Sequence, residues 1–314
     1  MPKQDTEDAE HADPLAGASY GSGGPRAFDS HAKLGEWGRF DFFVVGPPRT
    51  GVTWLYHSLK PHTNVPQYTE ETHFFRLYFS HGLRWYEGHF GNLVPGRPTG
   101  ETDPTYFASE LATERIRLVA PHAKIICTLR EPVERIFSLY KVKRAHSIIP
   151  WTFEEALERD PELLDSARYA YHLARWQKAF GVENVLPTFH HDLVNHPQAY
   201  VDRVGAFIGL PHFEVPPYPK YVDSSGGLTY PRSDKWTYGL ARVAERLKAH
   251  RWGFLIHAAK RSGMGKLFMG GGSEIKLDPE VARRLREQLT PEIEAVEAML
   301  GCDLASWKAS KETL

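Results

Sequence analysis

The sequence predicts an α/β fold in which a central parallel sheet is flanked by helices. Short apolar runs alternate with helical segments along the chain, which is the order found in parallel sheets built from strand–helix–strand units. The run Lys124–Leu129 is almost continuously apolar, as expected for a strand buried on both faces. A turn at Gly46–Gly51 follows the first apolar run with the spacing of a phosphate-binding loop. Together these features predict a single domain with a P-loop-like nucleotide-binding fold.

The elements of this domain follow in order from apolar runs, helical spacing and turn residues. Residues 1–38 are rich in small and acidic residues and are expected to form a disordered arm, which leaves 39–314 for the domain. A short second strand is expected to begin near Val65. The other expected elements are a strand at 40–45, a helix at 53–60, a loop at 95–104, a helix at 108–120, a strand at 124–129, helices at 133–144, 153–159 and 167–180, a strand at 184–189 and a helix at 200–208.

The carboxyl-terminal third is expected to contain a long loop followed by helices. The segment 212–235 is rich in Pro, Gly and Tyr, which is typical of a functional or lid-like loop. A helix is expected at 235–260 and a glycine-rich loop at 264–273. Apolar residues then recur at helical spacing over 281–300, where Pro291 is expected to start a second helix.

Composition excludes several classes of protein. The net charge of −1 gives no overall field that would attract nucleic acid. The two cysteines, Cys127 and Cys302, lie in unrelated contexts, so a disulfide framework is not expected and a cytoplasmic location is. The sequence holds no apolar run long enough for a membrane span, and its acidic start is unlike a secretory signal.

The turn after the first strand has the chemistry of a phosphate site. The spacing Gly46…Gly51-x-Thr53 fits G-x-x-x-x-G-K-[ST] except that Val52 replaces the lysine, and Arg49 is the only cation in the loop. Backbone N–H groups and the start of the next helix can still hold a phosphate. A nucleotide kinase uses the missing lysine on its triphosphate, so a P-loop kinase is a disfavoured alternative.

A second anion signal follows the strand at 124–129. Arg130 stands at its carboxyl end, where parallel sheets bind ligands, and Ser138 lies two helical turns further on. An arginine fork and a hydroxyl donor suit a phosphate monoester. The alternative is an arginine that caps the helix and a serine on its surface.

These two segments resemble the cofactor-binding motifs of the sulfotransferases. Pro48–Trp54 resembles their 5′-phosphosulfate loop, and Lys124–Tyr140 resembles their 3′-phosphate segment with its Arg-x-Pro-x-x-Arg-x-x-Ser-x-Tyr pattern. Tyr68–Phe75, Gly82–Tyr86 and Tyr169–Trp176 are similar to segments of the heparan sulfate branch, and the resemblance covers about residues 40–307. It implies 3′-phosphoadenosine 5′-phosphosulfate (PAPS) as cofactor and adenosine 3′,5′-bisphosphate (PAP) as product. The implied acceptor is a hydroxyl of a glycan, glycolipid or natural-product intermediate.

The resemblance also implies a role for individual residues. Glu71 is implied as the general base, with a pKa that burial among aromatic rings would raise and a nearby arginine would oppose. Arg49 is implied to contact the leaving 5′-phosphate, Arg130 and Ser138 the 3′-phosphate, and His73 the acceptor or Glu71. Backbone donors to the phosphosulfate are implied at Thr50, Gly51, Val52, Thr53 and Trp54. Alternatives are an exposed Glu70–Glu71 pair at a helix start and a structural His73.

The chain departs from the resembled pattern at two places. Thr102 follows Glu101 where the heparan sulfate branch commonly has a lysine, so a cation often counted in that active site is missing. Gly270–Ser273 replaces a cysteine-bridged loop and its contact with the cofactor is open. A non-catalytic nucleotide-binding module is therefore a further alternative. No metal is expected, because His190–Asp192 has no partner at zinc spacing. The sequence specifies neither the acceptor nor the oligomeric state.

Overall fold

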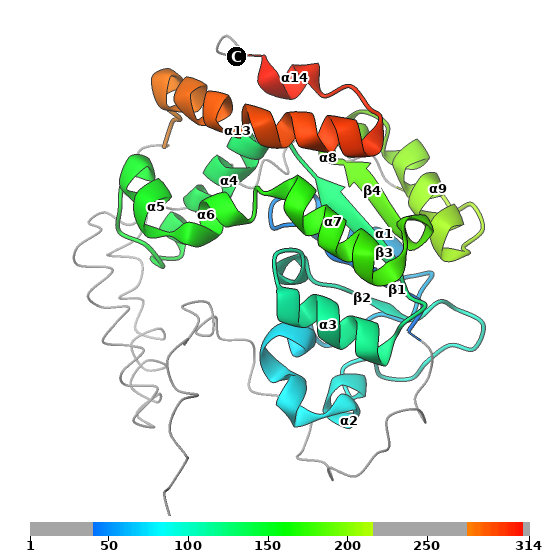
Figure 1. The fold of residues 1–314 in the computed structure, drawn as a ribbon. Helices are drawn as coiled ribbons and strands as arrows, with labels where there is room; N and C mark the ends of the chain where they lie inside the picture. Colours follow the sequence, from blue (N-terminus) through cyan, green and yellow to red (C-terminus); the bar gives the residue numbers. More distant parts are fainter. Residues whose placement is uncertain (1–39, 216–274, 310–314) are drawn as a thin grey trace, which may run out of the picture. The chain divides into compact units, whose positions relative to one another are not determined.

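The fold is centred on a four-stranded sheet in which every pair of neighbours is parallel. The strands are β1 (Phe42–Val44), β2 (Gly100–Thr102), β3 (Lys124–Leu129) and β4 (Val185–Phe189), in the order β2-β1-β3-β4 (Figure 1). Phe42 pairs with Gly100 on one side and with Lys124 on the other. The predicted parallel sheet flanked by helices is confirmed.

The computed structural model describes residues 40–215 and 275–309. The chain divides into two compact units, of which the larger holds residues 25–140, 153–226 and 276–314. The described part of the smaller unit is 141–152 with Ile275. Five predictions lie wholly or mostly outside the described residues: the arm at 1–38, the loop at 212–235, the helix at 235–260, the glycine-rich loop at 264–273 and, within it, the possible cofactor contact at Gly270–Ser273. The single-domain organisation stays a prediction.

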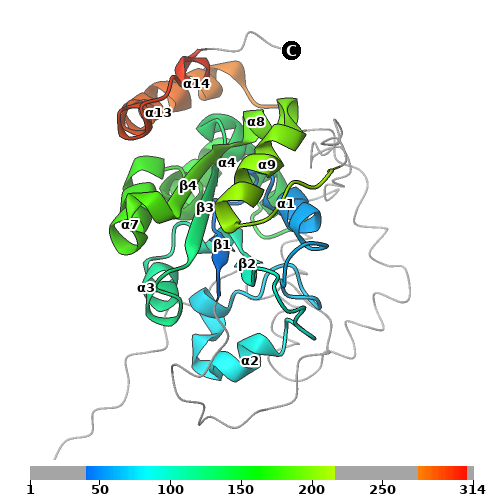
Figure 2. The ribbon, with the colours of Figure 1, turned by 90° about the vertical axis from the view of Figure 1, so that its right-hand side faces the viewer.

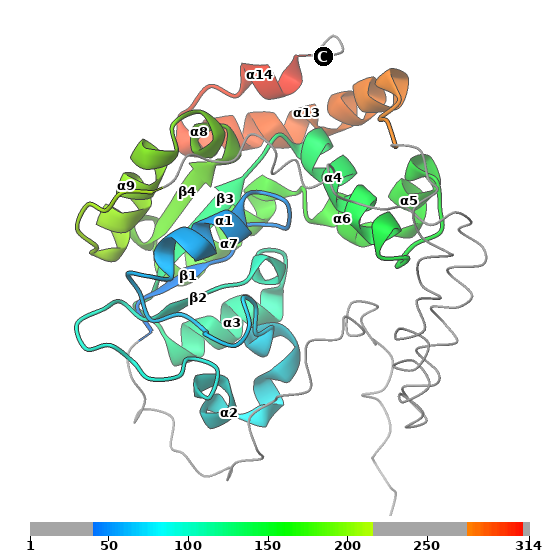
Figure 3. The ribbon, with the colours of Figure 1, turned by 180° about the vertical axis from the view of Figure 1, so that it is seen from behind.

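Helices of the larger unit cover both faces of the sheet. Alternate residues of β1 point to opposite faces, so Phe42 packs with α1 and α9 while Phe43 packs with α3 and α7. Figure 2 shows the sheet between these two helix layers, and Figure 3 shows the α1 and α9 side. In the part of the chain that the structure describes, the helices are α1 (Val52–Leu59), α2 (Leu83–Glu87), α3 (Glu110–Val119), α4 (Pro132–Ala145), whose end falls in the smaller unit, α5 (Phe153–Arg159), α6 (Pro161–Asp165), α7 (Tyr169–Phe180), α8 (His190–Asn195), α9 (Pro197–Ile208), α13 (Pro279–Leu300) and α14 (Ala305–Lys308). Short turns lie at Phe74–Tyr78, Phe79–His81, Pro104–Tyr106 and Val182–Asn184.

Three predictions of local structure are wrong. Residues 95–104 were expected to form a loop, yet Gly100–Thr102 is the edge strand β2, because it pairs with β1. The strand expected near Val65 is only a single bridge between Asn64 and Thr99. Pro291 does not start a second helix but lies inside α13. The helix continues because an apolar stripe that includes Leu289 and Ile293 stays buried on both sides of the proline.

The parallel arrangement brings the carboxyl ends of all four strands to one edge of the sheet. The loop 46–51 follows β1, Asp103 follows β2, Arg130 follows β3 and His190 follows β4. Ligands of open parallel sheets bind at this edge. Among the described residues, none of the helices combines the length and the apolar stretch needed to cross a lipid bilayer.

Candidate active site

The loop after β1 has a shape fixed by its contacts with β3 and α8. A Cβ atom on Gly46 would lie 1.8 Å from Thr128 Oγ1 and 2.6 Å from the Thr128 backbone, so only glycine fits there. Thr50 is fully buried; its hydroxyl donates to the Pro47 carbonyl at 2.8 Å and lies 2.5 Å from Thr128 Oγ1. Gly51 has a φ of 90° and leads into α1. The loop is therefore packed closely against β3 and α8.

The first turn of α1 supplies backbone donors to the same place. Val52, Thr53 and Trp54 begin this helix, and their N–H groups point toward its amino end, where no preceding turn can accept them. Such a helix start attracts anions. Val52 and Trp54 are buried and Thr53 is exposed, so the hydroxyl of Thr53 lies at the surface.

Arg49 joins the two segments that the sequence singled out. Its Nε donates to Ser138 Oγ at 3.1 Å, and Arg130 Nη1 donates to the Arg49 carbonyl at 3.4 Å. Arg49 has a φ of 78°. This left-handed conformation is costly for any residue other than glycine and is often found in functional loops. The arginine and the serine had been assigned to separate phosphates, whereas here they bond each other. Arg49, Arg130 and Ser138 form one group, which we call the cationic cluster.

The positive charge of the cationic cluster affects the pKa of His190, a residue of α8. Its ring lies 3.4 Å from the position of a Cβ on Gly51. Burial, and then repulsion by Arg130 with a smaller contribution from Arg49, lowers the pKa of His190 to about 3. The ring is thus neutral at physiological pH. From the sequence His190 was considered only as a metal ligand, because no local pattern indicates that α8 packs against the loop.

Arg130 is well placed to bind an additional anion. Its Nη2 lies 3.3 Å from Glu134 Oε2, while its Nε is buried and has no hydrogen-bond partner among the described residues. The backbone of Arg130 is held by the Tyr169 hydroxyl, which donates to its carbonyl at 3.0 Å. A buried guanidinium N–H without an acceptor is costly, so an anion that met it would be favoured.

A second group of titratable side chains lies at the end of β2. The Asp103 carboxylate is fully buried; one oxygen accepts from both the backbone N–H and the Nδ1 of His73, each at 2.9 Å. Its other oxygen accepts from the N–H and the hydroxyl of Thr105, at 2.9 and 2.6 Å. His73 Nε2 lies 3.7 Å from Glu71 Oε2. We call Glu71, His73 and Asp103 the acidic cluster.

The acidic cluster shifts the titration of its members. Burial, and then the Asp103 charge, raises the pKa of Glu71 to about 8, against an opposing contribution from His73. Burial disfavours the charged His73 ring, but the charge and hydrogen bond of Asp103, with smaller contributions from Glu71 and Glu101, act in the opposite direction, and the net effect raises the pKa of His73 to about 9. The expected upward shift of Glu71 is therefore present. The opposing cation is His73 and not the arginine that had been expected.

Glu101 supports the cluster from β2. Its carboxylate is fully buried and accepts from the N–H and hydroxyl of Thr72, from Tyr86 Oη at 2.8 Å and from Tyr106 Oη at 3.1 Å. Burial, followed by Asp103, raises the pKa of Glu101 to about 7, although the Thr72 hydrogen bonds act in the opposite direction. Because Thr72 lies between Glu71 and His73, its hydrogen bonds to Glu101 hold the loop that carries both residues.

The two glutamates at 70 and 71 occupy different environments. The Glu71 side chain is 25% exposed, whereas that of Glu70 is 44% exposed and lies 3.1 Å from His57 Nε2. The pair is therefore not an evenly exposed acidic patch. Its less exposed member is the one that resembles a general base.

The side chains of the acidic cluster lie close enough together to ligate a metal ion, but they also bond one another. Its three side chains offer ligand atoms within 4.8 Å of one another. Both oxygens of Asp103 already accept hydrogen bonds from His73 and Thr105, so the groups bond one another rather than converge on an ion. We therefore assign no metal to it.

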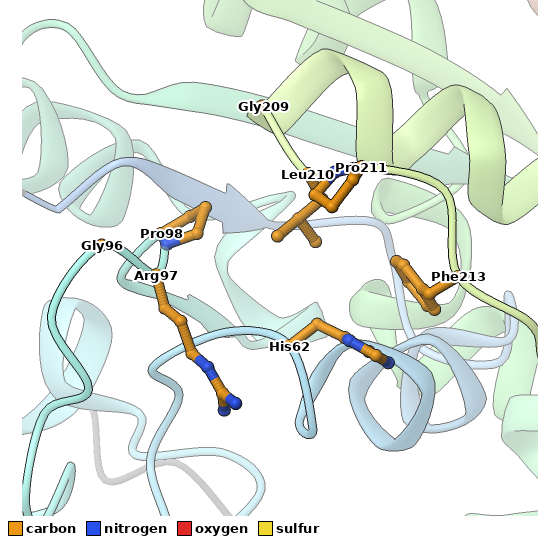
Figure 4. A pocket seen from close by; sticks show the side chains of 8 residues that line it. All are labelled: His62, Gly96, Arg97, Pro98, Gly209, Leu210, Pro211 and Phe213. Carbon is orange, nitrogen blue, oxygen red and sulfur yellow. The ribbon is translucent and has the colours of Figure 1, made fainter.

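The described residues also line a cavity of about 240 Å³ (Figure 4), and none of its lining residues belongs to either cluster. His62 stacks on Phe213 at its wall with ring centroids 3.9 Å apart. Pro98 lies just before β2, and Gly209 lies after α9, so the cavity is at the amino ends of the strands. The cavity and the candidate site therefore lie at opposite ends of the strands.

Known proteins resemble this chain in sequence and in fold. Residues 39–218 match the sulfotransferase domain family. The chain is 32% identical over 198 residues to the human bifunctional heparan sulfate N-deacetylase/N-sulfotransferase 3, which covers 55% of this chain and 22% of that protein. It is 31% identical over 175 residues to the mouse heparan sulfate glucosamine 3-O-sulfotransferase 6, which covers 53% of this chain and 51% of that protein. It thus spans about half, or less, of these relatives.

One solved structure shares the fold over most of the chain. The crystal structure of a sulfotransferase from Alicyclobacillus acidocaldarius superposes with a TM-score of 0.63 and 20% identity, covering 87% of this chain and 100% of that one. This likeness concerns the fold alone.

Proposed function

This chain belongs to the sulfotransferase domain family, and from that membership we propose that it moves a sulfuryl group from PAPS to an acceptor hydroxyl. The observation that carries the proposal is the meeting of Arg49, Arg130 and Ser138 at the carboxyl edge of the sheet. β1, which leads into the loop, lies between β2 and β3 in the sheet order. The cationic and acidic clusters thus follow neighbouring strands.

The residues present suit a nucleotide that carries two separated phosphates. The turn 46–51 and the first turn of α1 offer backbone donors for one phosphate, and the buried Nε of Arg130 with the Ser138 hydroxyl offers donors for the other. When bound, PAPS supplies an activated sulfuryl group and a phosphate that leaves with its electron pair. Arg49 would stabilise the charge that develops on that phosphate. Val52 in place of lysine makes the loop a poor triphosphate site.

Glu71 is the proposed general base. It would take the proton of the acceptor hydroxyl while the hydroxyl oxygen attacks. A carboxylate whose pKa lies at about 8 holds a proton more readily than an ordinary glutamate does, so it is a more effective base once it is ionised. His73, 3.7 Å away, would orient Glu71 or the acceptor.

The proposed acceptor is a carbohydrate hydroxyl. Both relatives have names that refer to heparan sulfate, and the segments around Glu71 and Trp85 resemble that branch. One of them is named as an N-sulfotransferase and the other as a 3-O-sulfotransferase, so only the second supports a hydroxyl as the acceptor group. A glycolipid or natural-product hydroxyl is the alternative. A cytoplasmic location stays a prediction from the sequence.

Calorimetric titration with PAP tests the binding site. Arg49→Ala and Arg130→Ala should each weaken binding by about 1–3 kcal/mol, because each removes a charged hydrogen-bond donor. Arg97→Ala is the matched control, because Arg97 lies at the opposite edge and should leave the affinity unchanged. Unaltered PAP affinity in both test variants, or tight binding of ATP only with magnesium, would overturn the assignment. Transfer of ³⁵S from labelled PAPS to a panel of acceptors then tests the reaction.

A further inference from the structure

The acidic cluster contains a charge arrangement that the resemblance did not foresee. We propose that Asp103 is a positioning residue that keeps His73 as an imidazolium cation beside Glu71. This cation takes the place of the lysine that Thr102 replaces. The role assigned to that cation in turnover rests on the proposed function, whereas the charge state of His73 does not.

The hydrogen bonds of Asp103 determine which nitrogen of His73 carries a proton. Asp103 is fully buried, and the oxygen that faces His73 accepts the backbone N–H of that residue. The same oxygen lies 2.9 Å from Nδ1. A buried carboxylate offers only acceptors, so Nδ1 must bear a hydrogen. The other ring nitrogen, Nε2, is the one that faces Glu71.

The charges that surround His73 favour its protonated form. The carboxyl groups facing it are Asp103 at 2.9 Å, Glu71 at 3.7 Å and, further away, Glu101 on β2. Thr105, which follows Asp103, contributes a neutral hydroxyl 3.4 Å from Nδ1. The three carboxyl groups together outweigh burial, which alone would favour the neutral ring.

Thr102 explains why the cation comes from a histidine. Thr102 is 2% exposed, and its hydroxyl has no hydrogen-bond partner among the described residues. The position that carries lysine in the resembled pattern therefore holds a short neutral group. Asp103, the next residue, instead anchors His73, which stands two residues after Glu71. The cation therefore comes from the loop that carries Glu71, and not from β2, where the resembled pattern has its lysine.

The protonated ring would act on Glu71 and on the reacting group. As a cation it favours the ionised form of Glu71, which is the form that accepts a proton. Its backbone φ of 52° is left-handed, and the Asp103 hydrogen bond to its N–H holds that conformation. Asp103 thus fixes both the position and the charge of the ring.

The experiment is an NMR titration of histidine rings in the full chain, without cofactor or acceptor. Protein labelled with ¹³C-histidine is titrated from pH 5 to 10, and His73 is assigned with His73→Gln. The expected midpoint for His73 is about 9. A midpoint near the ordinary value of about 6.5 would overturn the inference whatever the variants do.

Two variants identify Asp103 as the cause. Asp103→Asn should lower the His73 midpoint by about one to three units, because it removes the opposite charge at hydrogen-bond distance. Thr105→Val is the matched control: it deletes a hydrogen bond to the other Asp103 oxygen without altering charge, so the midpoint should stay within a few tenths of a unit. Should Asp103→Asn not fold, Asp103→Glu, which keeps the charge, should retain a raised midpoint. A drop in Asp103→Glu or in Thr105→Val as large as the one expected for Asp103→Asn would refute the role of the charge.

The titration separates this inference from the proposed function. If His73 titrates as expected but no acceptor is sulfated, the proposed reaction fails and the charge assignment stands. If turnover is found, its rate should fall on the alkaline side as His73 loses its proton, and Asp103→Asn should move that limb to lower pH. An alkaline limb that stays in place in Asp103→Asn would contradict the role in turnover.

Discussion

Replacement of Gly46 by alanine should damage both the stability of the protein and its phosphate loop. The new Cβ would lie 1.8 Å from Thr128 Oγ1 and 2.6 Å from the N and O atoms of Thr128. The hydroxyl can rotate away, but the backbone atoms belong to β3, which is paired with both β1 and β4. The loop must therefore shift outward, at a cost of about 1–3 kcal/mol or more, as in overpacked cores.

Thermal and urea unfolding measure this cost. For a domain of this size, about 1 kcal/mol corresponds to a Tm change of about 2–4 °C, so Gly46→Ala should lower Tm by about 2–12 °C. Gly205→Ala is the matched control. Gly205 lies inside α9, and its Cβ would make only ordinary contacts at 3.6 and 3.7 Å, so alanine should be neutral or stabilising there. PAP affinity should fall in Gly46→Ala alone. Wild-type Tm together with wild-type PAP affinity in Gly46→Ala would refute the reasoning.

Three further predictions concern the chemistry of the site. Glu71→Gln should keep PAP affinity but lower turnover by about a hundredfold or more, measured by ³⁵S transfer, because an amide cannot accept the hydroxyl proton; near-normal turnover would remove Glu71 as base. In the unaltered enzyme kcat/KM should rise with pH through about 8, since the pKa of Glu71 is raised and only its ionised form is active; a rate already maximal at pH 6 would contradict this. PAP should raise the pKa of His190 from about 3, because bound phosphates offset the repulsion by Arg130; an NMR titration in which this ring is unaffected by saturating PAP would place the ligand elsewhere.

The features that could be predicted from the sequence are those that a short continuous segment specifies by itself. The strand at 124–129 is a continuous apolar run, and the loop before α1 has fixed spacing, so each could be identified alone. Because parallel strands end at one edge, the encounter of Arg130 with the loop followed from the fold class. The bond between Arg49 and Ser138 did not, because it depends on side-chain conformations of residues far apart in sequence.

The missed features depend on pairing between distant segments. β2 has only three residues, and its composition resembles a loop; it is a strand because β1 lies beside it. The contact of His73 with Asp103 joins residues thirty positions apart, across an aromatic segment without regular periodicity. The one available signal was the acidic residue directly after Thr102, which adds a buried charge where the resembled pattern has lost a cation. A buried carboxylate requires a partner, and that requirement pointed to a nearby cation or donor.

The separation of the two clusters has a consequence for how a carboxylate base could work beside a phosphate site. Sulfuryl transfer needs positive charge at the leaving phosphate and a basic group at the acceptor, and these demands conflict if the groups adjoin. An arginine within about 4–6 Å of a carboxylate lowers its pKa by about 1–3 units and weakens it as a base. Here the largest electrostatic influences on Glu71 come from Asp103, His73, Glu70 and Glu101. Neither Arg49, which follows the neighbouring strand β1, nor Arg130, which follows β3, is among these influences, so the arginines leave the raised pKa of Glu71 in place. Thr102→Lys, which restores the cation of the resembled pattern at this buried position, should test this, because it should move the acid limb of the pH profile downward while leaving PAP affinity within a few fold.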